Sequence, residues 1–151
     1  MKKFGLIVLV ILAGCSGKPS KQEQPSLNGL CGFLTKAEIE AVLGRALDEE
    51  PVEINEDYLG GKGCSYSAGL DTSGNAYFAY VVVPDQAAFE KNKSDSETVG
   101  GVGDEAYRFN GPDAEQLWVR EGNHFVMVAI GDVPNLAGAK KLALLVLSRL
   151  K

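Results

Sequence analysis

The first fifteen residues most constrain the fold, because they decide how much of the chain is left to build a domain. Lys2 and Lys3 precede an apolar run, Phe4 to Ile11, which leads directly into Leu12-Ala13-Gly14-Cys15. A charged start, a short apolar stretch and small residues before a cysteine are typical of an export signal whose cysteine receives a lipid. A transmembrane helix would need about 20 apolar residues, whereas Phe4 to Gly14 provides eleven.

We therefore predict three segments: a signal peptide over residues 1–14, a lipid-anchored flexible tether over residues 15–28, and a single domain over residues 29–151. The tether is polar, contains prolines and offers almost nothing to bury. Lipidation of Cys15 would hold the domain on a membrane, facing the periplasm or the cell exterior. Because Ser16 follows Cys15, the expected site in a Gram-negative host is the outer membrane.

The charge balance narrows the range of partners. Without the leader the chain keeps 13 basic and 20 acidic residues, a formal net charge of −7. Lys91 and Lys93 lie among acids, and Lys140 and Lys141 share one expected helical turn, so no basic groove for phosphates is indicated. The sequence therefore argues against nucleic acid as a partner, and the acidic surplus is expected to serve solubility.

Two further cysteines, Cys31 and Cys64, remain in a chain expected to leave the reducing cytosol. Oxidising compartments favour a disulfide between them. The alternative is a metal site, which would need more ligands, and His124 is the one histidine of the sequence. We predict the disulfide, and expect neither a metal nor a cofactor.

Local patterns predict three helices and five or six strands. Thr35 and Glu38 have capping-box spacing for a first helix that ends at Gly44, and Gly60–Gly63 reads as a turn. Asp85 is placed to cap a second helix, and Asn135 a long apolar third one. The expected strands cover residues 52–54, 64–67, 76–83, 105–109, 116–120 and 124–130.

This order predicts an α+β domain, with an antiparallel sheet of about five to six strands and helices packed on one face. The last three strands, joined by short turns, are expected to form a meander. The succession of helix and strands, repeated once, is also compatible with two similar halves.

Several segments resemble a family of small bacterial lipoproteins of uncharacterised function, most familiar from actinobacteria. The similarity lies in the stretch from Cys31 to Gly44, in Cys64-Ser-Tyr-Ser, in Val102-Gly-Asp-Glu-Ala-Tyr and in residues 119–128. The resemblance implies a lipid-anchored envelope domain with one bridge between Cys31 and Cys64. It implies no activity and no catalytic residues. The chain departs from the family pattern at Phe33 and Val102, where leucine is usual.

Catalysis would depend on His124, with Asp104 or Glu121 to orient it and Ser65 or Ser67 as the nucleophile. Neither serine lies in a G-x-S-x-G frame, and a histidine at the start of a strand is commonplace. We therefore expect a protein that is not an enzyme, and a hydrolase using His124 is the least favoured alternative.

Aromatic residues on the predicted strands provide the remaining functional signal. If helices cover only one face of the sheet, some aromatic side chains lie on the other and offer rigid contact area with polar tips. We predict a recognition surface made by Trp118, Tyr107 and Tyr80, with the alternative that these residues belong to the core. The expected function is binding of a partner protein or small ligand, or else inhibition or sensing of an envelope enzyme.

Overall fold

The computed structural model describes residues 29–56, 60–111, 114–131 and 135–151. The predicted signal peptide, the tether and the lipidation site Cys15 lie outside the described residues. Within the described part, each helix is too short or too polar to cross a bilayer.

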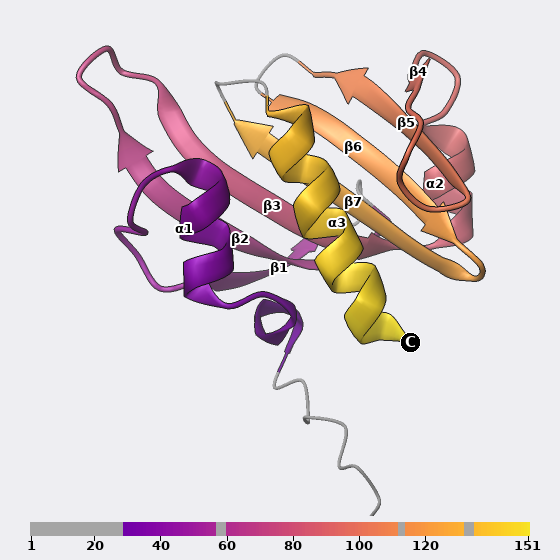
Figure 1. Ribbon diagram of the computed structural model, residues 1–151, viewed down its shortest axis with the longest axis horizontal. Helices are drawn as coiled ribbons and strands as arrows, with labels where there is room; N and C mark the ends of the chain where they lie inside the picture. The colour runs from indigo at the N-terminus through magenta and orange to yellow at the C-terminus, as the bar shows by residue number, and fades with distance from the viewer. Residues whose placement is uncertain (1–28, 57–59, 112–113, 132–134) are drawn as a thin grey trace, which may run out of the picture.

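Seven strands form one antiparallel sheet in the order β1-β2-β3-β7-β6-β5-β4 (Figure 1), so the α+β prediction is confirmed with a somewhat larger sheet. The central pair, β3 and β7, joins two meanders that are consecutive in the chain. The strands are β1 Val52–Glu56, β2 Gly61–Leu70, β3 Ala76–Pro84, β4 Glu97–Thr98, β5 Glu105–Asn110, β6 Ala114–Glu121 and β7 His124–Gly131.

Two short helices and one long helix accompany the sheet, together with a 3-10 turn. At the first helix the predicted capping box is present: Thr35 accepts a hydrogen bond from the backbone N–H of Glu38, and the Glu38 carboxylate accepts one from the backbone N–H of Thr35. Asp85 and Asn135 also cap the next two helices as expected. The elements are η1 Leu30–Phe33, α1 Lys36–Leu43, α2 Gln86–Lys91 and α3 Leu136–Leu150.

Strand β2 begins earlier than its sequence indicates. The glycine-rich stretch expected to be a turn, residues 60–63, instead contributes Gly61 and Gly63 to the strand, opposite Pro84 and Val82. A Cβ atom at Gly61 would stand 2.2 Å from the carbonyl oxygen of Val83. Glycine is present here because the neighbouring backbone comes too close for a side chain.

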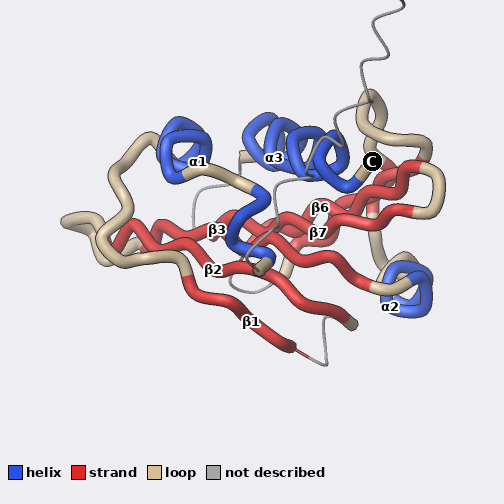
Figure 2. The backbone as a smooth tube through the Cα atoms, turned by 90° about the horizontal axis from the view of Figure 1, so that it is seen from below, coloured by secondary structure: helices blue, strands red, loops and turns tan. Residues whose placement is uncertain are grey.

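Helices α1 and α3 cover one face of the sheet, called the helix face below (Figure 2). Alternate strand residues point to this face and form the main core with the buried side of α3. Its largest fully buried members include Tyr66, Ile39, Leu117, Leu142 and Leu147. Burial of these apolar side chains is the main source of the domain's stability.

Helix α2 lies on the opposite side of the sheet, called the α2 face below (Figure 2). Ala88 and Phe89 of α2 belong to a second buried cluster together with strand residues of that face. The expected arrangement of helices on one face therefore describes α1 and α3, while α2 builds a smaller core of its own. Only Asp85 separates the end of β3 from α2, so this six-residue helix stays close to the end of that strand.

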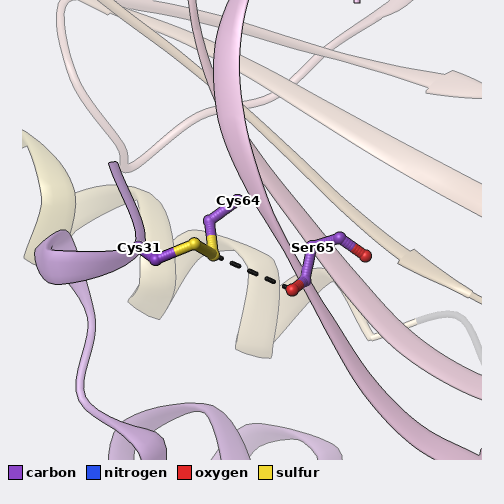
Figure 3. Close-up of a disulfide and its surroundings, with 3 residues drawn as sticks. All are labelled: Cys31, Cys64 and Ser65. Atoms are coloured by element: carbon purple, nitrogen blue, oxygen red, sulfur yellow. Dashed lines mark hydrogen bonds between the residues drawn. A yellow bond between two sulfur atoms is a disulfide. The ribbon is translucent and has the colours of Figure 1, made fainter. Parts of the chain in front are cut away.

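The Cys31–Cys64 disulfide is present and joins η1 to β2 (Figure 3), with Cα atoms 4.9 Å apart. The Cys64 sulfur is also 3.8 Å from the carbonyl oxygen of Ser65. The bridge spans 33 residues, which include α1 and β1. In the chain-entropy account, closing a loop of this length stabilises the folded state by roughly 3–4 kcal/mol.

An ion pair fastens the end of α3 to the beginning of the domain. Arg149 Nη2 lies 2.6 Å from Glu38 Oε1, and Nη1 lies 3.0 Å from Oε2. Arg149 also donates to the carbonyl oxygen of Phe33. Hydrogen bonds from Arg149, followed by that from the Thr35 backbone, lower the pKa of Glu38 to about 2. Burial raises the pKa of the neighbouring Tyr66 to about 12.

Candidate binding face of the sheet

The α2 face is crossed by a row of side chains in direct cross-strand register. Tyr107 of β5 pairs with Trp118 of β6, which pairs with Met127 of β7. The row continues through Val82 of β3 to Gly63 of β2. Because adjacent strands place opposed residues on the same face, the sequence of each strand decides which side chains meet here.

Phe89 of α2 covers one end of this face. Its ring centroid lies 5.0 Å from that of Tyr107 and 5.2 Å from that of Phe125. The Tyr107 hydroxyl donates a hydrogen bond to the carbonyl oxygen of Phe89. Burial accordingly raises the pKa of the Tyr107 phenol well above its usual range.

Two of the three residues predicted to form a recognition surface are therefore inaccessible. Trp118 is 1% exposed and Tyr107 is 2% exposed. Their rings stack with centroids 6.0 Å apart and an angle of 11° between planes, and Trp118 Nε1 donates to Gln116 Oε1. Trp118 and Tyr107 are cross-strand neighbours, as expected. Because α2 covers them they belong to the core, and the prediction that they form a contact surface is wrong.

Tyr80 lies elsewhere on the same face. It is two residues along β3 from Val82 and opposite Ala129 of β7, and it remains half-buried. Its aromatic neighbour is Phe78, with ring centroids 4.9 Å apart, rather than Trp118 or Tyr107. Tyr80 packs at the margin of the cluster that contains Ala88 and Phe89 of α2, whereas Phe78 is not part of that cluster. Helix α2 lies at the end of β3 that leads into it (Figure 2), so the start of the strand is left without a covering helix among the described elements.

The aromatic pair forms one surface with the neighbouring strands. Tyr80 pairs with Ser65 of β2, which pairs with Val52 of β1, and Val52 is 57% exposed. We call Phe78, Tyr80, Ser65 and Val52 the Tyr80 patch. It combines two aromatic rings, a hydroxyl and an exposed aliphatic side chain, a composition suited to recognition through apolar contact with polar tips.

Of the patch, sequence reasoning selected only Tyr80, and Phe78 is the aromatic member that it missed. A Cβ atom at Gly131 would stand 1.9 Å from a carbon of the Phe78 ring, so the ring lies against the backbone of β7. The sequence pattern that could have indicated this contact has two parts. Phe78 and Tyr80 alternate along one strand, and the small residues Ala129 and Gly131 alternate along another. The sequence does not tell which strands are neighbours, so this match was not apparent.

The residues considered for hydrolysis do not form a complete site: Glu121 of β6 lies directly opposite His124 of β7, but both serines belong to β2, two strands away. His124 starts β7 on the helix face, whereas Ser65 belongs to the α2 face of β2. The strand register also separates them by about five residues, roughly 17 Å. Asp104 instead accepts a hydrogen bond from the backbone N–H of Gly122, and Glu121 pairs with Lys151. The described residues also contain no group of three or more His, Cys, Asp or Glu able to hold a metal ion.

Comparison with known proteins found no matching family model, no matching curated protein and no matching solved structure.

Proposed function

We propose that this chain is an exported, lipid-anchored envelope protein that binds a partner protein or a small ligand through the Tyr80 patch, without catalysis. The observation that carries the binding role is an aromatic pair, Phe78 and Tyr80, on a part of the sheet that no described helix covers. Tyrosine and phenylalanine are enriched at protein interfaces, and tyrosine is over-represented among the residues that dominate binding energy.

The anchoring part of the proposal comes from the leader and the cysteines. Cys15 follows a leader with the length and flanks of a signal peptide. The Cys31–Cys64 disulfide supports export, because such bridges persist in oxidising compartments and are rare in the cytosol. A lipid on Cys15 also explains why the third cysteine would not compete for this pairing.

Anchoring is tested by mass spectrometry of the amino-terminal peptide from the membrane fraction. The expected peptide begins at Cys15 and carries a diacylglyceryl group, and a Cys15→Ser chain lacks that group and leaves the membrane fraction. A mature chain with an unmodified Cys15 thiol would refute the anchoring proposal.

Binding is tested by placing the photo-cross-linker benzoylphenylalanine at position 80 of the full chain in its own cells. Ala37, exposed on α1 at the other face, is the matched control position. A defined adduct from position 80 but not from position 37 supports the patch, and its loss in a Phe78→Ser variant links it to the aromatic pair. Equal adducts from both positions, or none from either, would argue against this surface.

A second candidate, inhibition of an envelope enzyme, is favoured by the hairpin between β2 and β3. Leu70 near its tip is 64% exposed, and Arg45 braces the hairpin by donating to the Leu70 carbonyl oxygen and stacking on Tyr77. A rigid projecting loop with an apolar residue suits insertion into an enzyme cleft. Co-purification of a stoichiometric enzyme that is lost with Leu70→Glu, but kept with Tyr80→Ser, would favour this candidate.

A further inference from the structure

The outer surface of α3 is basic, in contrast to the rest of the domain. From Asn135 to Lys151 the sequence has four basic residues and no Asp or Glu. Arg149 and Lys151 are neutralised by Glu38 and Glu121. The remaining two, Lys140 and Lys141, have no carboxylate partner among the described residues, and the Lys140 Nζ donates to the carbonyl oxygen of Gly100.

An open apolar groove of about 650 Å³ adjoins these lysines. Its lining includes Leu144 and Leu145 of α3 and Gly101 of the segment before β5. Leu144 is 46% exposed, which is unusual for a large aliphatic side chain in this domain. None of the described residues that line the groove is acidic, so this surface offers apolar contact and positive charge together.

The surface also lies within reach of the membrane anchor. The hydrogen bond from Arg149 to Phe33 brings the end of α3 beside η1, and Figure 1 shows the first described residues and the C-terminus at the same end of the domain. The tether predicted for residues 15–28 would span about 20 Å on average if it behaves as a flexible chain. Figure 2 places α3 on the side of the sheet opposite α2.

We propose that the outer surface of α3 rests on an anionic bilayer, with Lys140 and Lys141 at the lipid phosphates and Leu144 at the boundary with the acyl chains. The inference rests on the lipid anchor proposed above, which supplies the membrane. Each lysine close to an anionic leaflet favours contact roughly fivefold, and apolar side chains flanked by lysines are typical of helices lying at the interface. In this orientation the Tyr80 patch, on the other face, points away from the membrane.

The test uses the full lipidated chain in vesicles and a water-soluble amine-reactive ester, with labelling of each lysine measured by mass spectrometry. In vesicles with an equal mixture of phosphatidylglycerol and phosphatidylcholine, labelling of Lys140 and Lys141 is expected to fall by about threefold or more relative to detergent. Lys91, exposed on α2 at the opposite side of the sheet, is the internal control and is expected to stay unchanged. High salt or pure phosphatidylcholine should restore the labelling of Lys140 and Lys141.

Two charge-reversal variants test whether the protection of Lys140 depends on the charge of its neighbour. Lys141→Glu is expected to return Lys140 labelling in anionic vesicles to its detergent level, whereas Lys91→Glu, on the opposite side of the sheet, is expected to leave it protected. Unprotected lysines on a chain that does associate with vesicles would overturn the inference while the anchor stands. Protection that is the same in neutral and anionic vesicles would also overturn it, because the contact would then not depend on anionic headgroups. A chain that does not associate with vesicles at all would refute the anchor itself.

Discussion

The Phe78 ring lies against the backbone of Gly131, so closely that a methyl group at position 131 would stand 1.9 Å from the ring. The two residues lie 53 positions apart in the sequence and meet because β3 and β7 are neighbours at the centre of the sheet. The glycine therefore provides the space that holds one ring of the Tyr80 patch in place.

Gly131→Ala is expected to destabilise the domain by about 1–3 kcal/mol, because the added methyl group overlaps the Phe78 ring. Urea unfolding measures the change. Gly100→Ala is the matched control, since a Cβ there meets nothing within 4 Å. Adding Phe78→Ala to Gly131→Ala should recover part of the loss, and equal midpoints for the two glycine variants would contradict the contact.

Replacing both bridged cysteines, Cys31→Ala with Cys64→Ala, is expected to lower the free energy of unfolding by roughly 3–4 kcal/mol. The cause is the added freedom of the unfolded 33-residue loop. Denaturant unfolding with and without reductant measures it, and reductant should affect the parent chain but not the double variant. A parent chain indifferent to reductant, with two reactive thiols at these positions, would show that the bridge is absent.

The Glu38–Arg149 pair predicts an acid-dependent loss of stability. Because Arg149 keeps the pKa of Glu38 at about 2 in the folded domain, below its ordinary value of 4.5, the unfolded chain binds this proton more tightly. The contribution of the pair is complete above about pH 5 and is lost as the pH falls toward about 2. We expect Arg149→Met to cost about 1–2 kcal/mol at neutral pH.

Arg149→Met should also weaken the fall in stability toward acid pH, measured as the free energy of unfolding between about pH 6 and about pH 3. Lys91→Met, which removes an exposed lysine of α2, serves as the control and should leave this fall as it is. An Arg149→Met curve parallel to that of the parent chain would exclude the pair as its source.

The sole tryptophan of the sequence reports on the α2 face. Because Trp118 is 1% exposed, its fluorescence is expected to be blue-shifted and weakly quenched by acrylamide, and to stay so when a ligand occupies the Tyr80 patch. A red emission with efficient quenching in the native chain would contradict the burial of Trp118.

The neighbouring Tyr107 gives a second test of the same buried cluster. Tyr107→Phe removes the hydrogen bond to the carbonyl oxygen of Phe89 and should lower the free energy of unfolding of the domain by about 1–2 kcal/mol.

Features set by neighbours in the sequence could be predicted. The capping box of Thr35 and Glu38 needs only residues one turn apart, and the Asp85 and Asn135 caps follow the same local rule. The two-residue period of a strand is local as well, so the sequence of β3 alone puts Phe78 and Tyr80 on one face. The pairing of Cys31 with Cys64 followed from the small number of cysteines rather than from geometry.

Features that depend on tertiary contact could not be predicted from the sequence. The strand β4 consists of Glu97 and Thr98, whose polar side chains give no strand pattern, and it exists because they pair with Arg108 and Tyr107. The apolar residues of α2, mainly Ala88 and Phe89, do not indicate which face of the sheet they will cover. The choice of face nonetheless decides the site, because it turns Trp118 from a potential contact residue into core and leaves Tyr80 at the margin.

The edge strand β1 carries the exposed Glu53, and the exposed Glu49 and Glu50 precede the strand. At the other edge of the sheet, β4 is only two residues long. An exposed edge strand can form backbone hydrogen bonds with the edge strand of another molecule and so start aggregation. Here two molecules meeting border to border through β1 would bring carboxylates together, while β4 is too short to template a ladder. The domain can thus be crowded at high density without its sheets joining end to end.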